Sequence, residues 1–357
     1  MNDRVKKLGS AILPFADAAL IFSEVSRFYF TGFPASDGCL LVTPKESVFY
    51  TDSRYTEAAE KKIGAEFVRD SKELYKDLAA FFADRGIKTV ALENDRLTLA
   101  QYEELCEKLP GISFCVTDAL AKAIEEIRIV KTDDEIQKIV KAQRIAEKAF
   151  EHILGFIKPG KTENEVRLEL EYFMLSHGAD GLSFETIAVT GVKTSMPHGV
   201  PGDNVIKSGD FVTMDYGALV DGYHSDMTRT VAVGDITDEQ RRVYDTVLKA
   251  QLAGLKSLHD GISGFDADKA ARDVIANAGY GCCFGHGTGH GVGVEIHEAP
   301  TLSPRSKHIL KTGHVVTVEP GIYIPGKFGV RIEDMALITD DGCSILTDCP
   351  KELTVLR

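Results

Sequence analysis

The alternation of hydrophobic and polar positions changes character near residue 128. Before that point, short apolar runs alternate with helical stretches, which is typical of an α/β domain. The expected strands cover residues 19–23, 38–43, 47–51 and 89–93, and the expected helices cover residues 55–63, 72–85 and 100–108. We therefore predict an α/β N-terminal domain over residues 1–127 and a second domain over residues 128–357.

The N-terminal domain carries no nucleophile, metal or phosphate motif. Asp52 and Arg54 follow a predicted strand and are placed to reach a ligand, but the residues favour a solvated helix start capped by Asp52. The first 22 residues superficially resemble a signal peptide. Pro14 and Asp17 interrupt their apolar core, so we predict a surface helix that leads into a strand.

The second domain begins with a long amphipathic helix. Thr132 and Glu135 form a T-x-x-E capping box, and the apolar residues after it recur with a helical period. A second capping box at Thr162 begins a helix over residues 163–176. The same order returns later, with a T-x-x-Q box at Thr237 and a shorter helix over residues 266–278.

The segment from Gly155 to Thr162 matches the phosphate-loop pattern G-x-x-x-x-G-K-T. A phosphate loop follows a strand, whereas a long helix precedes this segment. Pro159 also removes one of the amide donors that a phosphate needs. The pattern therefore favours a helix–turn–helix connection, and an ATPase remains the minor alternative.

Residues 211–231 read as a β-hairpin around an Asp221-Gly222 turn, with Asp215 and Asp226 in its two arms. A loop centred between residues 220 and 221 places the two carboxylates directly opposite each other. A loop centred one residue later makes them diagonal neighbours. In both cases the period of two places both carboxylates on one face of the hairpin.

A second hairpin repeats this arrangement. Residues 314–324 and 329–338 flank a turn over residues 325–328, with a register centred on Gly326 that pairs Glu319 with Glu333. Like charges side by side on paired strands are destabilising unless a cation lies between them. We therefore infer a metal between the carboxylates; a solvated acidic face or a single structural cation is the alternative.

The recurrence of elements indicates an internal duplication. Thr132 and Thr237 begin the long helices 105 residues apart, and Asp215 and Glu319 lie 104 residues apart. Two helix–helix–hairpin units packed about a pseudo-twofold axis would bring all four carboxylates together. The repeat is inferred from element order, because sequence identity between the halves is low.

Bulk composition restricts the partners. The net charge of −13 argues against nucleic acid and anionic membranes, and it suits the retention of divalent cations. No apolar run approaches the roughly 18 residues that a membrane helix needs. The seven cysteines are odd in number and lack C-x-x-C spacing, which indicates a reduced, cytoplasmic protein.

A glycine-rich segment, residues 285–298, contributes three histidines, His286, His290 and His297. It fits neither the G-x-G-x-x-G dinucleotide loop nor the H-E-x-x-H zinc motif. Its glycines would let the backbone approach a site closely. Four carboxylates and an imidazole form an oxygen-rich, mixed donor set that favours Mn²⁺, Co²⁺, Fe²⁺ or Zn²⁺, and bridging carboxylates suit two ions.

These residues and their flanks, in this order, resemble the M24 "pita-bread" metallopeptidases over about residues 130–345. The five positions that match the family's metal ligands are Asp215 in MDYG, Asp226 in SDMTRT, His290 in GTGHGVG, Glu319 in VEPGIY and Glu333 in VRIED. His198 in MPHG and His297 in EIHEAP match its two active-site histidines. The first domain resembles that of prolidase, aminopeptidase P and creatinase.

The resemblance implies an α+β pita-bread catalytic domain with a pseudo-twofold duplication, and an Xaa-Pro peptidase. The expected activity is hydrolysis of the bond before proline in a dipeptide. Aminopeptidase P activity on longer peptides is the alternative, and a non-catalytic binding protein on the same fold is a further one. The expected substrate is a short proline-containing peptide, and a homodimer is expected from the resemblance.

The resemblance also implies roles for the site residues. Two divalent ions would share a hydroxide and be bridged by Asp226 and Glu333. Mn²⁺ or Co²⁺ are the expected ions, with Zn²⁺ or Fe²⁺ as alternatives. Asp215 would complete one ion's ligands, and His290 and Glu319 those of the other. Four further assignments follow: His297 as oxyanion stabiliser, Glu319 as proton shuttle, His198 as positioning group and Arg331 as partner of Glu333 or of a substrate carboxylate. A structural salt bridge is the alternative role for Arg331. His224, His286 and Tyr323 are expected to support the site without binding metal.

Overall fold

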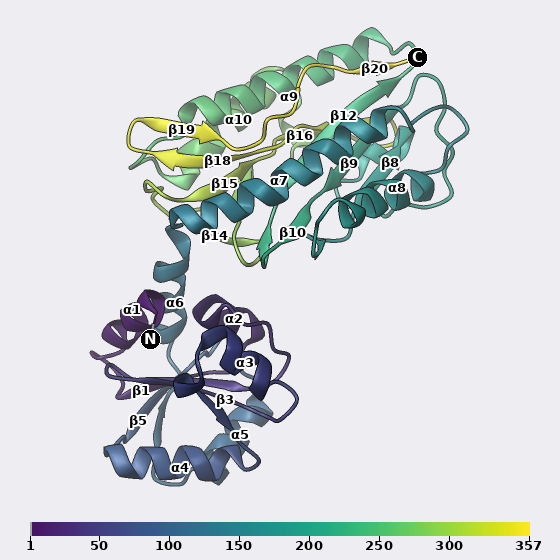
Figure 1. Ribbon diagram of the computed structural model, residues 1–357. Helices are drawn as coiled ribbons and strands as arrows, with labels where there is room; N and C mark the ends of the chain where they lie inside the picture. The colour runs from purple at the N-terminus through teal and green to yellow at the C-terminus, as the bar shows by residue number, and fades with distance from the viewer. Residues whose placement is uncertain (1) are drawn as a thin grey trace. The chain divides into compact units, whose positions relative to one another are not determined.

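The computed structural model describes residues 2–357, which fold into two compact units (Figure 1). One unit ends at Arg128, and the other runs from Ile129 to Arg357. Each unit has its own hydrophobic core.

The first unit is built on a six-stranded mixed sheet with strand order β4-β3-β2-β1-β5-β6. The strands are β1 (Ala18–Ile21), β2 (Cys39–Val42), β3 (Ser47–Thr51), β4 (Val68–Asp70), β5 (Thr89–Leu92) and β6 (Ser113–Cys115). The antiparallel β1–β2 and β2–β3 pairs lie in the middle of the sheet, and parallel pairs form both of its edges. The predicted α/β alternation is therefore present, although β4 and β6 are too short to give a sequence pattern.

Helices cover both faces of this sheet (Figure 1). They are α1 (Asp3–Ala11), α2 (Glu24–Thr31), α3 (Thr56–Ile63), α4 (Leu74–Arg85), α5 (Leu99–Lys108) and α6 (Ala119–Ile129), with a 3-10 turn η1 at Ala65–Phe67. One face packs Leu20, Leu41 and Val90 against Phe82 of α4 and Leu105 of α5. Both faces are buried, so the central strands are apolar throughout.

The second unit contains four helices in two consecutive pairs. They are α7 (Asp133–Leu154), α8 (Glu163–Ser176), α9 (Asp238–Ser257) and α10 (Gly264–Asn277). Thr132, Thr162 and Thr237 form the predicted capping boxes, with both reciprocal hydrogen bonds present in each. The segment from Gly155 to Thr162 connects α7 to α8 and follows no strand, so the helix–turn–helix interpretation holds.

Two main sheets occupy the second unit. One has the order β20-β12-β9-β8 and the other β14-β13-β15-β18-β19, with smaller β11-β10-β7 and β16-β17 sheets beside them. In the first half the strands are β7 (Gly181–Leu182), β8 (Ile187–Thr190), β9 (Phe211–Tyr216), β10 (Ala218–Val220), β11 (Tyr223–His224) and β12 (Met227–Val233), with η2 at Gly191–Ser195. In the second they are β13 (Gly289–Gly291), β14 (Glu298–Leu302), β15 (Val315–Val318), β16 (Gly321–Ile324), β17 (Phe328–Arg331), β18 (Asp334–Thr339), β19 (Gly342–Ile345) and β20 (Val355–Leu356), with η3 at Gly281–Cys283.

The register of the first hairpin decides between the two alternatives left open by the sequence. Val220 pairs with Tyr223 around an Asp221-Gly222 turn, and Asp215 pairs with Thr228. Asp215 and Asp226 are therefore diagonal neighbours. Both turn residues have positive φ, 50° and 75°, and glycine adopts that conformation without strain.

The second hairpin has the predicted register, with Ile324 paired to Phe328 and Val318 to Asp334. The turn is one residue shorter than expected, because Phe328 already belongs to β17. Both hairpins are interrupted at their carboxylates. Asp226 lies between β11 and β12, and Glu319 and Glu333 lie in the matching gaps of the second hairpin. Among the described residues, no helix has the length and apolar character needed to cross a membrane.

Candidate metal centre

A cavity of about 1030 Å³ opens in the second unit, and the carboxylate-bearing gaps in both hairpins line it. All eight residues singled out from the sequence lie in its wall: His198, Asp215, Asp226, His290, His297, Glu319, Arg331 and Glu333. The two halves of the unit thus contribute to a single site.

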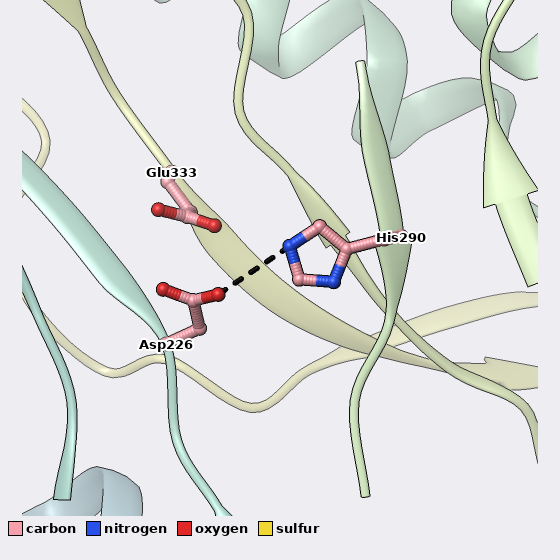
Figure 2. A group of neighbouring side chains, drawn as sticks. All are labelled: Asp226, His290 and Glu333. Atoms are coloured by element: carbon pink, nitrogen blue, oxygen red, sulfur yellow. Dashed lines mark ion pairs between the residues drawn. The ribbon is translucent and has the colours of Figure 1, made fainter. Parts of the chain in front are cut away.

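Three of these side chains point toward one another, as Figure 2 shows for Asp226, His290 and Glu333. One ligand atom from each of Asp226, His290 and Glu333 lies within 4.8 Å of the others. His290 Nε2 is 3.5 Å from Asp226 Oδ2 and 3.4 Å from Glu319 Oε1. This spacing suits a cation held by carboxylate oxygens and an imidazole nitrogen.

The orientation of His290 is fixed by its other ring nitrogen. Nδ1 lies 3.0 Å from the carbonyl oxygen of Gly291, so a proton on Nδ1 donates to that oxygen and leaves the Nε2 lone pair facing the carboxylates. Burial lowers the pKa of His290 to about 4 and favours this neutral form. Gly289, one residue earlier, has no room for a Cβ, which would lie 2.0 Å from the carbonyl oxygen of Thr317.

The carboxylates are held in a site that opposes their negative charge. Burial, together with the neighbouring carboxylates, raises the pKa of Asp226 and of Glu333 well above the usual range. Burial also raises the pKa of Glu319 to about 8. A divalent cation would offset this repulsion and keep all the groups ionised.

One carboxylate oxygen of Asp215 is buried and, among the described residues, unpaired, which bears on whether these donors fit a cation. Its Oδ2 accepts from Arg331 at 2.5 Å, whereas its Oδ1 is buried without a hydrogen-bond partner in the part of the chain that the structure describes. Buried carboxylate oxygens are normally satisfied. The donor set therefore fits a metal, with Asp215 Oδ1 available as a further ligand atom.

Arg331 is the cation that the protein itself places in this wall. It is buried, and it donates to Thr228 Oγ1, the carbonyl oxygen of Pro197 and the hydroxyl of Tyr323, besides Asp215. Its ion pair is therefore with Asp215, whereas the sequence had suggested Glu333 as its carboxylate partner.

Thr228 is a site residue that sequence reasoning missed. Its hydroxyl donates to Glu333 Oε2 at 2.7 Å and accepts from Arg331 Nε at 3.0 Å. It lies two residues after Asp226, so strand periodicity already placed it on the ligand face. What the sequence could not show was that β12 would pack against Glu333, which is 105 residues away.

The remaining histidines occupy different surroundings. His198 and His297 are exposed in the cavity wall, and the His297 ring lies 4.4 Å from that of His290, centroid to centroid. His286 Nε2 contacts the hydroxyl of Tyr323 at 2.9 Å. His224 contacts Ser183 through Nδ1 and does not belong to the residues that line the cavity.

Comparison with known proteins agrees with this geometry. Residues 137–340 match metallopeptidase family M24, and residues 14–130 match the creatinase/prolidase N-terminal domain. The chain belongs to metallopeptidase family M24. The resemblance inferred from the ligand motifs is confirmed, as are the α/β N-terminal domain and the pita-bread catalytic domain.

Relatives of this M24 peptidase match it over nearly its whole length. It is 39% identical to the Xaa-Pro dipeptidase of Pyrococcus horikoshii over 99% of both chains, and 44% identical to the "Uncharacterized peptidase YqhT" of Bacillus subtilis over 95% of this chain and 96% of that one. The solved Xaa-Pro dipeptidase from Bacillus anthracis has a TM-score of 0.95, at 43% identity and 99% coverage of both chains. The X-Pro aminopeptidase of Thermotoga maritima has a TM-score of 0.92, at 37% identity, covering 99% of this chain and 100% of that one.

Proposed function

We propose that this M24 peptidase hydrolyses the peptide bond that precedes proline in Xaa-Pro dipeptides. The observation that carries the proposal is the cluster of Asp226, His290 and Glu333 inside the large cavity. Xaa-Pro dipeptidases among its relatives support the substrate class.

Two divalent ions are the proposed cofactors, with Mn²⁺ or Co²⁺ as the first candidates and Zn²⁺ or Fe²⁺ as alternatives. Asp226 and Glu333 would bind both ions, Asp215 one of them, and His290 and Glu319 the other. When bound, such ions lower the pKa of water and polarise a carbonyl oxygen.

The protein's own groups account for orientation and proton transfer in this proposal. Arg331 holds Asp215 with one carboxylate oxygen left for a ligand, and Thr228 fixes Glu333. Glu319 is the group that would carry a proton to the leaving proline nitrogen, a role proposed on the family resemblance. His297, beside His290 in the cavity wall, would donate to the oxygen that becomes negative during attack. His198, exposed in the same wall, would position the substrate.

The cellular setting is part of the same proposal. All seven cysteines are free, which supports a reducing, cytoplasmic location. A homodimer is also proposed, on the family resemblance. The X-Pro aminopeptidase among the solved relatives favours one alternative substrate, a longer peptide with proline at its second position.

The decisive experiment measures products from Ala-Pro and from Ala-Pro-Ala, with added Mn²⁺ or Co²⁺ and after chelation. Metal-dependent release of free proline from Ala-Pro alone supports the dipeptidase. Release of Pro-Ala from the tripeptide identifies an aminopeptidase P activity. Absence of metal-dependent turnover of both peptides would refute the proposed function.

A His297→Ala variant tests the division between metal ligands and other catalytic groups. We expect it to retain its metal content and to lose most of its kcat. Loss of metal from this variant would make His297 a ligand and contradict its proposed role.

A further inference from the structure

One carboxylate in the cavity has no assigned partner. Six acidic residues line the cavity: Glu171, Glu185, Asp215, Asp226, Glu319 and Glu333. Four of them belong to the metal centre, and Glu171 is paired with Arg167 of α8 at 2.9 Å. The Glu185 side chain is exposed in the cavity and makes no hydrogen bond and no ion pair with any residue that the structure describes.

Glu185 lies close in sequence and register to a proposed metal ligand. Ile187, two residues further on, pairs with Asp215 in the β8–β9 ladder, and it also lines the cavity. Glu185 lies two residues before the start of β8, and it lines the same cavity as Ile187 and Asp215. The Glu185 carboxylate is thus held on the wall that carries Asp215.

A second unpartnered polar group adjoins it. Thr186 is 2% exposed and belongs to the cavity wall, and its Oγ1 has no hydrogen-bond partner among residues 2–357. Buried hydroxyls without partners are uncommon in folded proteins. A carboxylate and a hydroxyl on consecutive residues, neither of them used by the protein, are suited to a ligand that donates several hydrogen bonds.

The charge of the cavity defines the chemistry of that ligand. The two arginines in the wall, Arg167 and Arg331, are both paired with carboxylates, so neither neutralises Glu185. An alkylammonium group is complementary, because it carries a positive charge and three N–H donors. In an Xaa-Pro peptide, the α-ammonium is attached next to the carbonyl that must reach the metal centre.

We propose that Glu185 binds an alkylammonium group of the substrate and so determines specificity. This inference rests on the proposed function. The group is either the α-ammonium of the residue before proline or the side-chain ammonium of a lysine at that position. In the first case the enzyme requires a free N-terminus, and in the second it prefers Lys-Pro.

The test compares wild type with Glu185→Gln on three substrates: Ala-Pro, norleucyl-Pro and Lys-Pro. Glutamine keeps the size of the side chain and removes its charge. A charged hydrogen bond of this kind should change KM by about tenfold or more and leave kcat nearly unchanged. The matched control is Glu151→Gln, an identical change on an exposed residue of α7 that does not line the cavity.

The pattern of losses identifies the bound group. A higher KM for all three substrates, with an unchanged inhibition constant for propionyl-proline, which lacks the amine, assigns the α-ammonium. A higher KM for Lys-Pro alone assigns the side chain. Equal KM values for wild type and variant on every substrate would overturn the inference.

Two controls separate this outcome from other failures. If wild type does not hydrolyse Ala-Pro, the proposed function itself fails. If wild type is active and Glu185→Gln has the same KM values, only the proposed role of Glu185 is refuted. Metal content and the thermal midpoint are measured for each variant. If Glu185→Gln fails to fold, Glu185→Ser supplies the uncharged side chain, and Glu185→Asp should restore part of the affinity because it restores the charge.

Discussion

Arg331 Nη2 lies 2.5 Å from Asp215 Oδ2, an ion pair that joins the two halves of the catalytic unit. Asp215 belongs to β9 and Arg331 to β17, so the pair bridges the first hairpin and the second. Both side chains are largely buried, at 14% and 4% exposure. Since the guanidinium occupies only Oδ2, it fixes the carboxylate and leaves Oδ1 available to the metal centre.

Removal of His290, the proposed imidazole ligand, should release the metal. We expect His290→Ala to lose metal retention and hydrolysis together, because His290 supplies the nitrogen donor in the cluster of Asp226 and Glu333. Metal analysis after desalting and the proline-release assay provide the measurements. A variant that remains fully active after metal depletion would contradict the site.

Thr228 should control metal affinity without binding the metal. Thr228→Val keeps the shape of the side chain but removes the hydrogen bonds to Glu333 and Arg331. Loss of such a supporting contact typically weakens metal binding by about 10- to 100-fold. Calorimetric titration of the metal-free protein checks this value. Thr228→Ser, which keeps the hydroxyl, is the control and should bind nearly as well as wild type.

The buried ion pair between Arg229 and Asp334 should dominate the stability of the catalytic unit. Arg229 Nη2 donates to Asp334 Oδ1 at 2.8 Å, and Arg229 nitrogens also donate to the carbonyl oxygens of Glu333, Cys349 and Pro350. Arg229→Met removes the partner of Asp334 Oδ1, while Oδ2 keeps its contacts with Lys351 and Gln251. The unfolding free energy should therefore fall by about 3 kcal/mol. Denaturant unfolding measures the loss.

The double variant Arg229→Met/Asp334→Leu tests the origin of that loss. It removes both charges of that pair and leaves Lys351, the partly exposed second partner of Asp334, without its carboxylate. Because no fully buried charge remains unpaired, the double variant should lose less unfolding free energy than the single variant. An equal or larger loss in the double variant would show that the carbonyl contacts of Arg229, rather than its charge partner, dominate.

His314 should make the fold sensitive to acid. It is 2% exposed, and burial lowers the pKa of its imidazole to about 4, while Nδ1 accepts from the backbone amide of Lys311. The folded state therefore prefers neutral His314, whereas the unfolded chain takes up a proton near the ordinary imidazole pKa of about 6.5. The resulting stability is complete above about pH 6.5 and is lost as the pH falls toward 4.

His314→Asn keeps an acceptor near the position of Nδ1 and removes the titrating group. Between pH 7 and pH 4.5, the variant should lose roughly 2 kcal/mol less unfolding free energy than wild type does. Urea unfolding of both proteins at the two pH values provides the comparison. Parallel losses in the two proteins would show that His314 does not contribute to acid sensitivity.

The sequence by itself determined the local elements and the order of the site residues. Capping boxes at Thr132, Thr162 and Thr237 mark helix starts because they satisfy amide groups within one turn of the chain. The Asp221-Gly222 turn is equally local, since two positive φ angles specify it. The five proposed ligand positions and the two proposed active-site histidines could be singled out because their flanking residues form short, contiguous motifs.

Only the tertiary structure decided how these residues meet. The register that makes Asp215 and Asp226 diagonal neighbours depends on packing between strands, and two registers had been compatible with the same turn signal. The roles of Thr228 and Arg229 depend on contacts with Glu333 and Asp334 across about a hundred residues of chain. The unpaired state of Glu185 is likewise a property of the cavity. Such contacts leave no local pattern, because the partners become neighbours only when the two halves pack together.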